Sequence, residues 1–166
     1  NALAKHHVGG QLSVAPEHVS PRVLEKMKKP GIESYERFQR MFEQASSACG
    51  KEQYDIPYFI SGHPGSTLED MIDLALWLKK NGRRPRQVQD FIPTPMAMAT
   101  CMYYTGIDPL TMTPVYTAIG LRAKKLQKAL LLYWSPEQWP LATGTVKHVG
   151  DPVAVVIGTD TRVYRS

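Results

Sequence analysis

The sequence has few cysteines and no long apolar run. Its two cysteines, Cys49 and Cys101, lie far apart in a chain of 166 residues, without a CxxC or histidine-rich spacing around them. This pattern indicates neither a disulfide framework nor a zinc site. The richest apolar stretches, LALWL and ALLLYW, are short and flanked by charge, whereas a membrane span requires about 18 apolar residues. We therefore expect a cytoplasmic chain that enters no membrane, provides no metal site and keeps both thiols reduced.

The first ten residues, NALAKHHVGG, also lack the features of a protein's start. They contain no initiating methionine, no basic leader and no long apolar run, so they do not resemble a signal peptide. We expect them to continue a longer protein. Hydrophobic residues make up 43% of the chain and charged residues 21%, which suits a globular domain with a buried core.

The net charge of +5 comes from three basic clusters. Such clusters can contact nucleic acid. Each of them also lies on or just after a predicted helix, where lysine and arginine serve as solvated faces and stabilise the helix C-terminus. We favour the second interpretation and keep an RNA-interacting domain as an alternative. The clusters are Lys26, Lys28 and Lys29; Lys79, Lys80, Arg83, Arg84 and Arg86; and Arg122, Lys124, Lys125 and Lys128.

Apolar patterning predicts parallel strands that alternate with helices, as in an α/β layer. Strands are predicted at residues 11–18, 54–61 and 87–92. Three helices are predicted between and after the first two strands: one from Ser20–Pro21 to Met27, one capped by Ser34 that runs to Cys49, and one with a Ser66–Glu69 capping box that runs to Asn81. The second helix should bury one face, which consists of Tyr35, Phe38, Met41, Phe42, Ala45 and Cys49.

The rest of the chain shows weaker patterning. Residues 93–116, rich in Pro, Met, Thr and Tyr, predict a long ordered loop, and such loops often carry function. Residues 117–134 predict a helix, which SPEQW follows as a further turn, and VAVVI in the tail predicts a short strand. We divide the chain at this point into residues 1–116 and a C-terminal extension, 117–166. One face of the extension helix should point into the core; its residues are Ile119, Leu126, Leu130 and Tyr133.

The segment GHPGS, residues 62–66, joins a predicted strand to a predicted helix. Free backbone N–H groups at such a junction can bind an anion. The segment matches neither a P-loop nor a GxGxxG motif. Pro64 and Gly65 could also simply turn the chain, and His63 could be a base, a ligand or a hydrogen-bonding strut. A nucleotide- or phosphate-binding α/β module therefore stays open as an alternative function.

Polar residues occur at the ends of all three predicted strands. Ligand sites of parallel α/β folds collect at the carboxyl ends of the strands. We therefore expect a strand-end rim, formed by Glu17, Ser61, His63 and Gln89. An alternative for Glu17 and His18 is that they only brace the turn that follows the first strand.

A resemblance to a known family extends over residues 6–139. Its stretches are VAPEHVSPRVLEKMKKPGIESYERF, GKEQYDIPYFISGHPGSTLEDMIDLALWLKKNG and QVQDFIPTPMAMATCMYYTGIDP, in this order. They closely resemble the C-terminal half of the radical S-adenosylmethionine (radical SAM) proteins of the YgiQ type. The resemblance implies a partial (β/α) radical SAM-type barrel, strands four to six with their helices, followed by a helical C-terminal extension.

The resemblance also implies a cofactor chemistry. Radical SAM enzymes bind a 4Fe-4S cluster through a CxxxCxxC loop, and the reduced cluster splits S-adenosylmethionine (SAM) to a 5′-deoxyadenosyl radical. This chain contains no CxxxCxxC motif. It should therefore be an inactive fragment of an iron–sulfur enzyme of unknown substrate, whose cluster cysteines lie outside the chain, in a missing N-terminal half that is its expected partner.

The site residues follow from the positions that match the family. Glu17 matches the fourth-strand acid near the SAM ribose or amino group, and residues 60–63 match the fifth-strand edge near adenine. The broad GxIxGxxE pattern of that edge would need glycine at Tyr58 and glutamate at Gly65, so the adenine contact is the weaker one. The predicted cofactor-binding residues are Glu17, His18, Ser61, Gly62, His63 and Gln89; a catalytic residue is not predicted.

Overall fold

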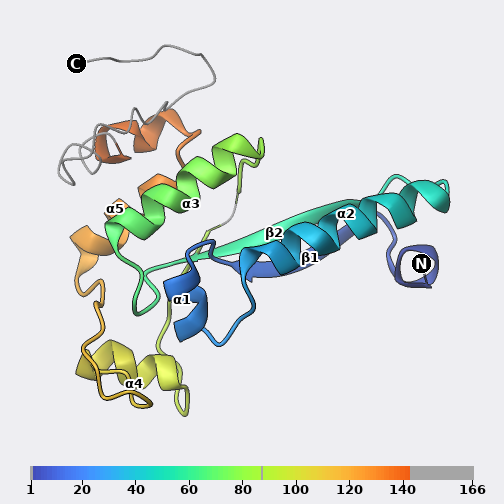
Figure 1. Cartoon of the computed structure of the whole chain (residues 1–166). Helices are drawn as coiled ribbons and strands as arrows, with labels where there is room; N and C mark the ends of the chain where they lie inside the picture. The colour runs from blue at the N-terminus through green and yellow to red at the C-terminus, as the bar shows by residue number, and fades with distance from the viewer. Residues whose placement is uncertain (1, 87, 143–166) are drawn as a thin grey trace.

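The computed structural model describes residues 2–86 and 88–142. Its strands and helices alternate in the first part and give way to helices in the second (Figure 1). The strands are β1 (Gln11–Glu17), β2 (Tyr54–Ser61) and β3 (Gln89–Asp90). The helices are α1 (Pro21–Lys26), α2 (Ile32–Ala48), α3 (Leu68–Lys80), α4 (Met98–Thr105) and α5 (Leu121–Leu131), together with a π-helical turn at Leu3–His7 and a 3-10 turn at Pro136–Gln138.

The strands form a parallel sheet in the order β1-β2-β3. The first two strands lie side by side along most of their length, with α2 running along them (Figure 1). The predicted α/β class with parallel strands is therefore confirmed. The third strand was expected over residues 87–92 but contains only Gln89 and Asp90, and PTP follows shortly after it. Proline lacks the N–H that a sheet interior needs, which agrees with this early end.

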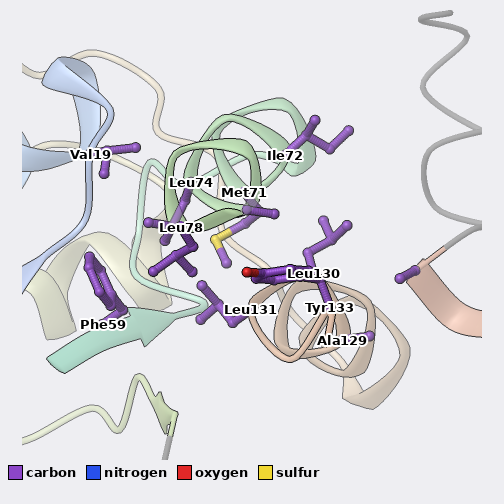
Figure 2. Close-up of a cluster of buried hydrophobic side chains, with 12 residues drawn as sticks. Val19, Phe59, Met71, Ile72, Leu74, Leu78, Ala129, Leu130, Leu131 and Tyr133 are labelled. Carbon is purple, nitrogen blue, oxygen red and sulfur yellow. The ribbon is translucent and has the colours of Figure 1, made fainter. Parts of the chain in front are cut away.

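The main core lies between α3 and α5 and extends to the sheet (Figure 2). Met71, Leu74 and Leu78 of α3 face Leu130 and Leu131 of α5, and all five side chains are fully buried. Phe59 joins this core from β2. A helix of the predicted extension thus contributes to the same core as the strands and α3.

The face of α2 around Phe42 packs differently from the prediction. Phe42 is buried with Ala4 of the N-terminal π-helical turn and with Val8, which follows that turn, and Phe38 packs against them. Met41, expected on the same face, is 63% exposed. Successive residues of an α-helix are about 100° apart around its axis, so the face centred on Phe42 turns its neighbour Met41 away.

Several predicted boundaries were wrong. The cap of α2 is Gly31, not Ser34, because the helix already begins at Ile32. The capping box of α3 is formed by Thr67 and Asp70, one residue later than the predicted pair Ser66 and Glu69. The Thr67 hydroxyl accepts from the Asp70 N–H at 3.3 Å, and the Asp70 carboxylate accepts from the Thr67 N–H at 2.9 Å.

The C-terminal part also differs from the prediction. Residues 93–116 were predicted as a loop, but they contain α4, of which only Met102 is buried. The helix predicted from residue 117 begins at Leu121, and Ile119, expected to face inward, is 68% exposed because it precedes the helix. The predicted strand VAVVI lies outside the described residues. Among the helices of the described residues, none combines the length and the apolar character needed to cross a membrane.

Candidate functional site at the strand ends

Glu17 closes β1 in an uncommon backbone conformation. The pairing of β1 with β2 is interrupted between Val14 and Glu17, and Glu17 has a φ of 66°. A non-glycine residue in this left-handed region is strained, and such strain concentrates at functional sites. The carboxylate of Glu17 is partly exposed and forms an ion pair with Lys29 at 2.9 Å. The structure thus holds a reachable carboxylate at the end of the first strand.

His18 is fully buried directly after Glu17. Its Nδ1 accepts hydrogen bonds from the N–H groups of Val19 and Ser20, both at 3.0 Å. A neutral ring therefore carries its proton on Nε2, which lies 3.3 Å from the Ser66 hydroxyl. Burial lowers the pKa of His18 from 6.5 to about 4, against the opposing effect of Asp70. Both ring nitrogens have partners within the chain, so His18 braces the turn as a neutral strut.

His63 lies in the turn that follows β2 and has one ring nitrogen engaged. Its Nδ1–H donates to the carbonyl of Pro64 at 2.8 Å, which leaves the lone pair on Nε2. The ring meets Phe91 edge to face, with 5.2 Å between centroids. Burial lowers the pKa of His63, and the Pro64 hydrogen bond and the Glu17 charge partly oppose this. At neutral pH the ring is therefore uncharged, and Nε2 can accept a hydrogen bond or a proton.

Three N–H groups of the GHPGS turn already have acceptors within the chain. The Gly62 N–H donates to Gln127 Oε1 at 2.8 Å, the Gly65 N–H donates to the Tyr116 carbonyl at 2.7 Å, and the Ser66 N–H donates to the His63 carbonyl at 3.0 Å. The Thr67 N–H is taken by Asp70. An anion at this turn would have to displace these partners, so the geometry does not favour the phosphate-binding alternative.

Ser61 and Gln89 lie on opposite faces of the sheet. Ser61 is paired in register with Asp90, and its hydroxyl donates to the Asp90 carboxylate at 2.6 Å. Gln89 is paired with Ile60 and is exposed. Since consecutive residues of a strand point to opposite faces, Gln89 points away from Ser61. The structure therefore gathers Glu17, His18, His63 and Ser66 at one edge of the sheet, while Gln89 lies on the other face from Ser61.

Comparison with known proteins places the chain in a family. It is 56% identical over 136 residues to a UPF0313 protein of Geobacter sulfurreducens, covering 82% of this chain and 22% of that protein. It is 50% identical over 153 residues to the UPF0313 protein YgiQ of Escherichia coli, covering 89% and 21%. A relative in Methanosarcina acetivorans is 49% identical over 148 residues, covering 89% and 20%. The chain belongs to the UPF0313 family.

The chain spans about a fifth of the length of these UPF0313 relatives. Residues 86–163 match a family model described as a domain of unknown function, DUF3362. The match begins just before β3 and includes α4 and α5. The predicted resemblance to the YgiQ type is thus confirmed, and the DUF3362 segment includes residues that pack directly on the candidate site.

Three residues at the site were missed by the sequence reasoning: Asp90, Gln127 and Lys128. Gln127 is fully buried and donates from Nε2 to the Ser66 carbonyl at 2.7 Å, in addition to its bond with Gly62. Lys128 forms an ion pair with Asp90 at 3.0 Å. A signal for Gln127 was present, because it lies three and four residues before the buried Leu130 and Leu131 and so shares their face.

The described residues offer no site for the cluster that the resemblance implies. Cys49 is half-buried at the end of α2 and Cys101 is exposed on α4. Within residues 2–86 and 88–142, no three side chains of His, Cys, Asp or Glu come together as a metal site.

Proposed function

We propose that this chain supplies part of the SAM- and substrate-binding rim of a radical SAM iron–sulfur enzyme. The observation that carries the proposal is the convergence of Glu17 and His63 at the carboxyl ends of two adjacent parallel strands. Ligands of parallel α/β folds bind at this edge. The resemblance to radical SAM barrels implies that positions facing SAM lie at these two strand ends, which supports the proposal.

The side chains fit the polar groups of SAM. The carboxylate of Glu17 accepts hydrogen bonds, as ribose hydroxyls and an ammonium group require. Its strained backbone agrees with a functional role. His63 holds an unprotonated Nε2 and can accept from an N–H or O–H group. When bound, SAM and a 4Fe-4S cluster would supply the radical chemistry, while these residues orient the ligand and exclude water from it.

An RNA-interacting domain is the remaining alternative from the sequence, and no observation at the site favours it. Of the basic residues that would test it, Arg83 forms an ion pair with buried Asp55 at 2.8 Å. Its neutralisation would disturb the fold as well as the surface charge. Arg84 and Arg86 are exposed, so a gel shift in a salt series should compare those two substitutions with the unsubstituted chain.

The proposal is tested in a full-length UPF0313 protein that carries this sequence in the matching segment. The protein is reconstituted anaerobically with iron and sulfide, reduced, and supplied with SAM. The proposal expects 5′-deoxyadenosine to form, and to form only when the cluster is present. A protein that assembles the cluster, binds no SAM and releases no 5′-deoxyadenosine would contradict it.

A further inference from the structure

The side chain of Gln127 closes the GHPGS turn from outside the strand–turn–helix unit. Its Oε1 accepts from the Gly62 N–H at 2.8 Å and its Nε2 donates to the Ser66 carbonyl at 2.7 Å. Gly62 and Ser66 are the first and last residues of this turn, and His63 lies between them. One buried amide thus bonds both ends of the segment that carries the candidate base.

A hydrophobic side chain would suit this place better if packing alone mattered. Gln127 is fully buried on α5, the helix that supplies Leu130 and Leu131 to the apolar core, and a buried amide is costly unless it is hydrogen-bonded. Here the amide meets the backbone of the turn with both its donor and its acceptor. A buried amide whose nitrogen and oxygen both have partners favours one arrangement of those partners.

The segment that matches DUF3362 makes a second hydrogen bond that holds the GHPGS turn. The Gly65 N–H donates to the Tyr116 carbonyl at 2.7 Å. Next to Gln127, Lys128 pairs with Asp90, whose carboxylate accepts from Ser61. Residues 116, 127 and 128 all belong to the segment that matches DUF3362. This segment therefore contacts the end of β2 and the turn after it at several points.

We propose that Gln127 is a positioning residue, which holds the GHPGS turn in the conformation that places His63 at the strand-end rim. The DUF3362 segment then contributes to the site through hydrogen bonds that hold the turn, and not through contact with the ligand. The consequence for SAM binding rests on the proposed function, whereas the effect on the turn does not.

The effect on the turn is measured by hydrogen exchange of the chain, with mass-spectrometric detection. Gln127→Met removes both hydrogen bonds at similar side-chain length, and Lys125→Met on the exposed side of α5 is the matched control. For Gln127→Met, we expect exchange in residues 60–67 to rise about tenfold, with α3 unchanged. Unchanged exchange in residues 60–67, or an equal rise throughout α3, would overturn the proposal.

The effect on the site is measured as the dissociation constant for SAM in the reconstituted full-length protein. We expect Gln127→Met to weaken SAM binding about tenfold and Lys125→Met to leave it unchanged. Faster exchange in the turn with an unchanged dissociation constant would overturn the positioning role. If the unsubstituted protein binds no SAM, the proposed function fails, and the exchange data decide whether Gln127 holds the turn.

Discussion

The Nε2 atom of His18 lies 3.3 Å from the hydroxyl of Ser66, 48 residues later in the chain. This contact joins the end of β1 to the turn after β2. Both side chains are fully buried, so the hydrogen bond is enclosed at the meeting point of the two strand ends. Protonation of the His18 ring would add a proton to Nδ1, which accepts from the N–H groups of Val19 and Ser20, so these two bonds require a neutral ring and make the turn after β1 sensitive to pH.

Stability should fall in acid because of His18. Its pKa is lowered from 6.5 to about 4, so the unfolded ring takes up a proton before the folded ring does. The stabilisation is complete above about pH 6.5 and is lost as pH falls through about 4, with a maximum loss of about 3 kcal/mol. Urea unfolding at several pH values measures it. The decline should be flatter in His18→Asn and unchanged in His6→Asn, which alters an exposed ring; a decline of equal size in both would contradict this cause.

Arg83 should contribute more to the free energy of unfolding than its neighbour Arg84. The carboxylate of Asp55 is buried, accepts from the Tyr35 hydroxyl and pairs with Arg83 at 2.8 Å. Arg83→Met leaves this charge without its cation, and we expect a loss of about 2 kcal/mol in the free energy of unfolding. Arg84→Met changes an exposed side chain and should cost less than about 0.5 kcal/mol. Equal effects in chemical denaturation would show that the Asp55 pair does not stabilise the fold.

Thr67, and not Ser34, should behave as a helix cap. The Thr67 side chain accepts from the Asp70 N–H at the start of α3, so Thr67→Ala should lower the free energy of unfolding by about 1 kcal/mol. Ser34 lies inside α2, and Ser34→Ala should change stability by less than about 0.5 kcal/mol. Thermal unfolding of both variants tests this assignment. A larger loss for Ser34→Ala would favour the boundary expected from the sequence.

Inorganic phosphate should not bind at the GHPGS turn. The N–H groups of Gly62, Gly65 and Ser66 already have acceptors within the chain. Isothermal titration with phosphate should therefore show no saturable heat, and the amide resonances of these three residues should not move. Saturable shifts confined to these three amides would revive the nucleotide- or phosphate-binding alternative.

The sequence predicted the layout of the fold because that layout depends on local patterns. Alternating and helical periodicity predicted β1, β2, α2 and α3 and their parallel arrangement. The cap of α3 was misplaced because Ser66 with Glu69 and Thr67 with Asp70 both place an acidic residue three positions after a hydroxyl cap. Ser66 instead contacts His18, which directly follows β1, and no local pattern predicts this contact. The helix α4 was missed because it buries a single residue and thus has little periodicity.

The candidate site was predictable only in part. The strand-end rule predicted that Glu17 and His63 lie at the same edge of the sheet, and in the structure the charge of Glu17 acts on His63. Side chains alternate between the two faces of a sheet, so the pairing of Gln89 with Ile60 puts Gln89 on the face opposite Ser61. The sequence does not give this pairing. Gln127 lies 65 residues from Gly62, and no local pattern pairs them. Contacts of this range follow from the packing of α5 on α3, which the sequence alone does not fix.

The most direct test of the proposed function is the affinity of a reconstituted full-length UPF0313 protein, carrying this sequence, for SAM. Equilibrium dialysis would compare the unsubstituted protein with Glu17→Gln and with Glu25→Gln, which changes an exposed residue of α1. If Glu17 binds SAM at the strand-end rim, Glu17→Gln should weaken binding about tenfold or more, because a charge-assisted hydrogen bond is lost. Glu25→Gln should have no effect. Equal affinity of all three proteins would contradict the placement of SAM at this rim.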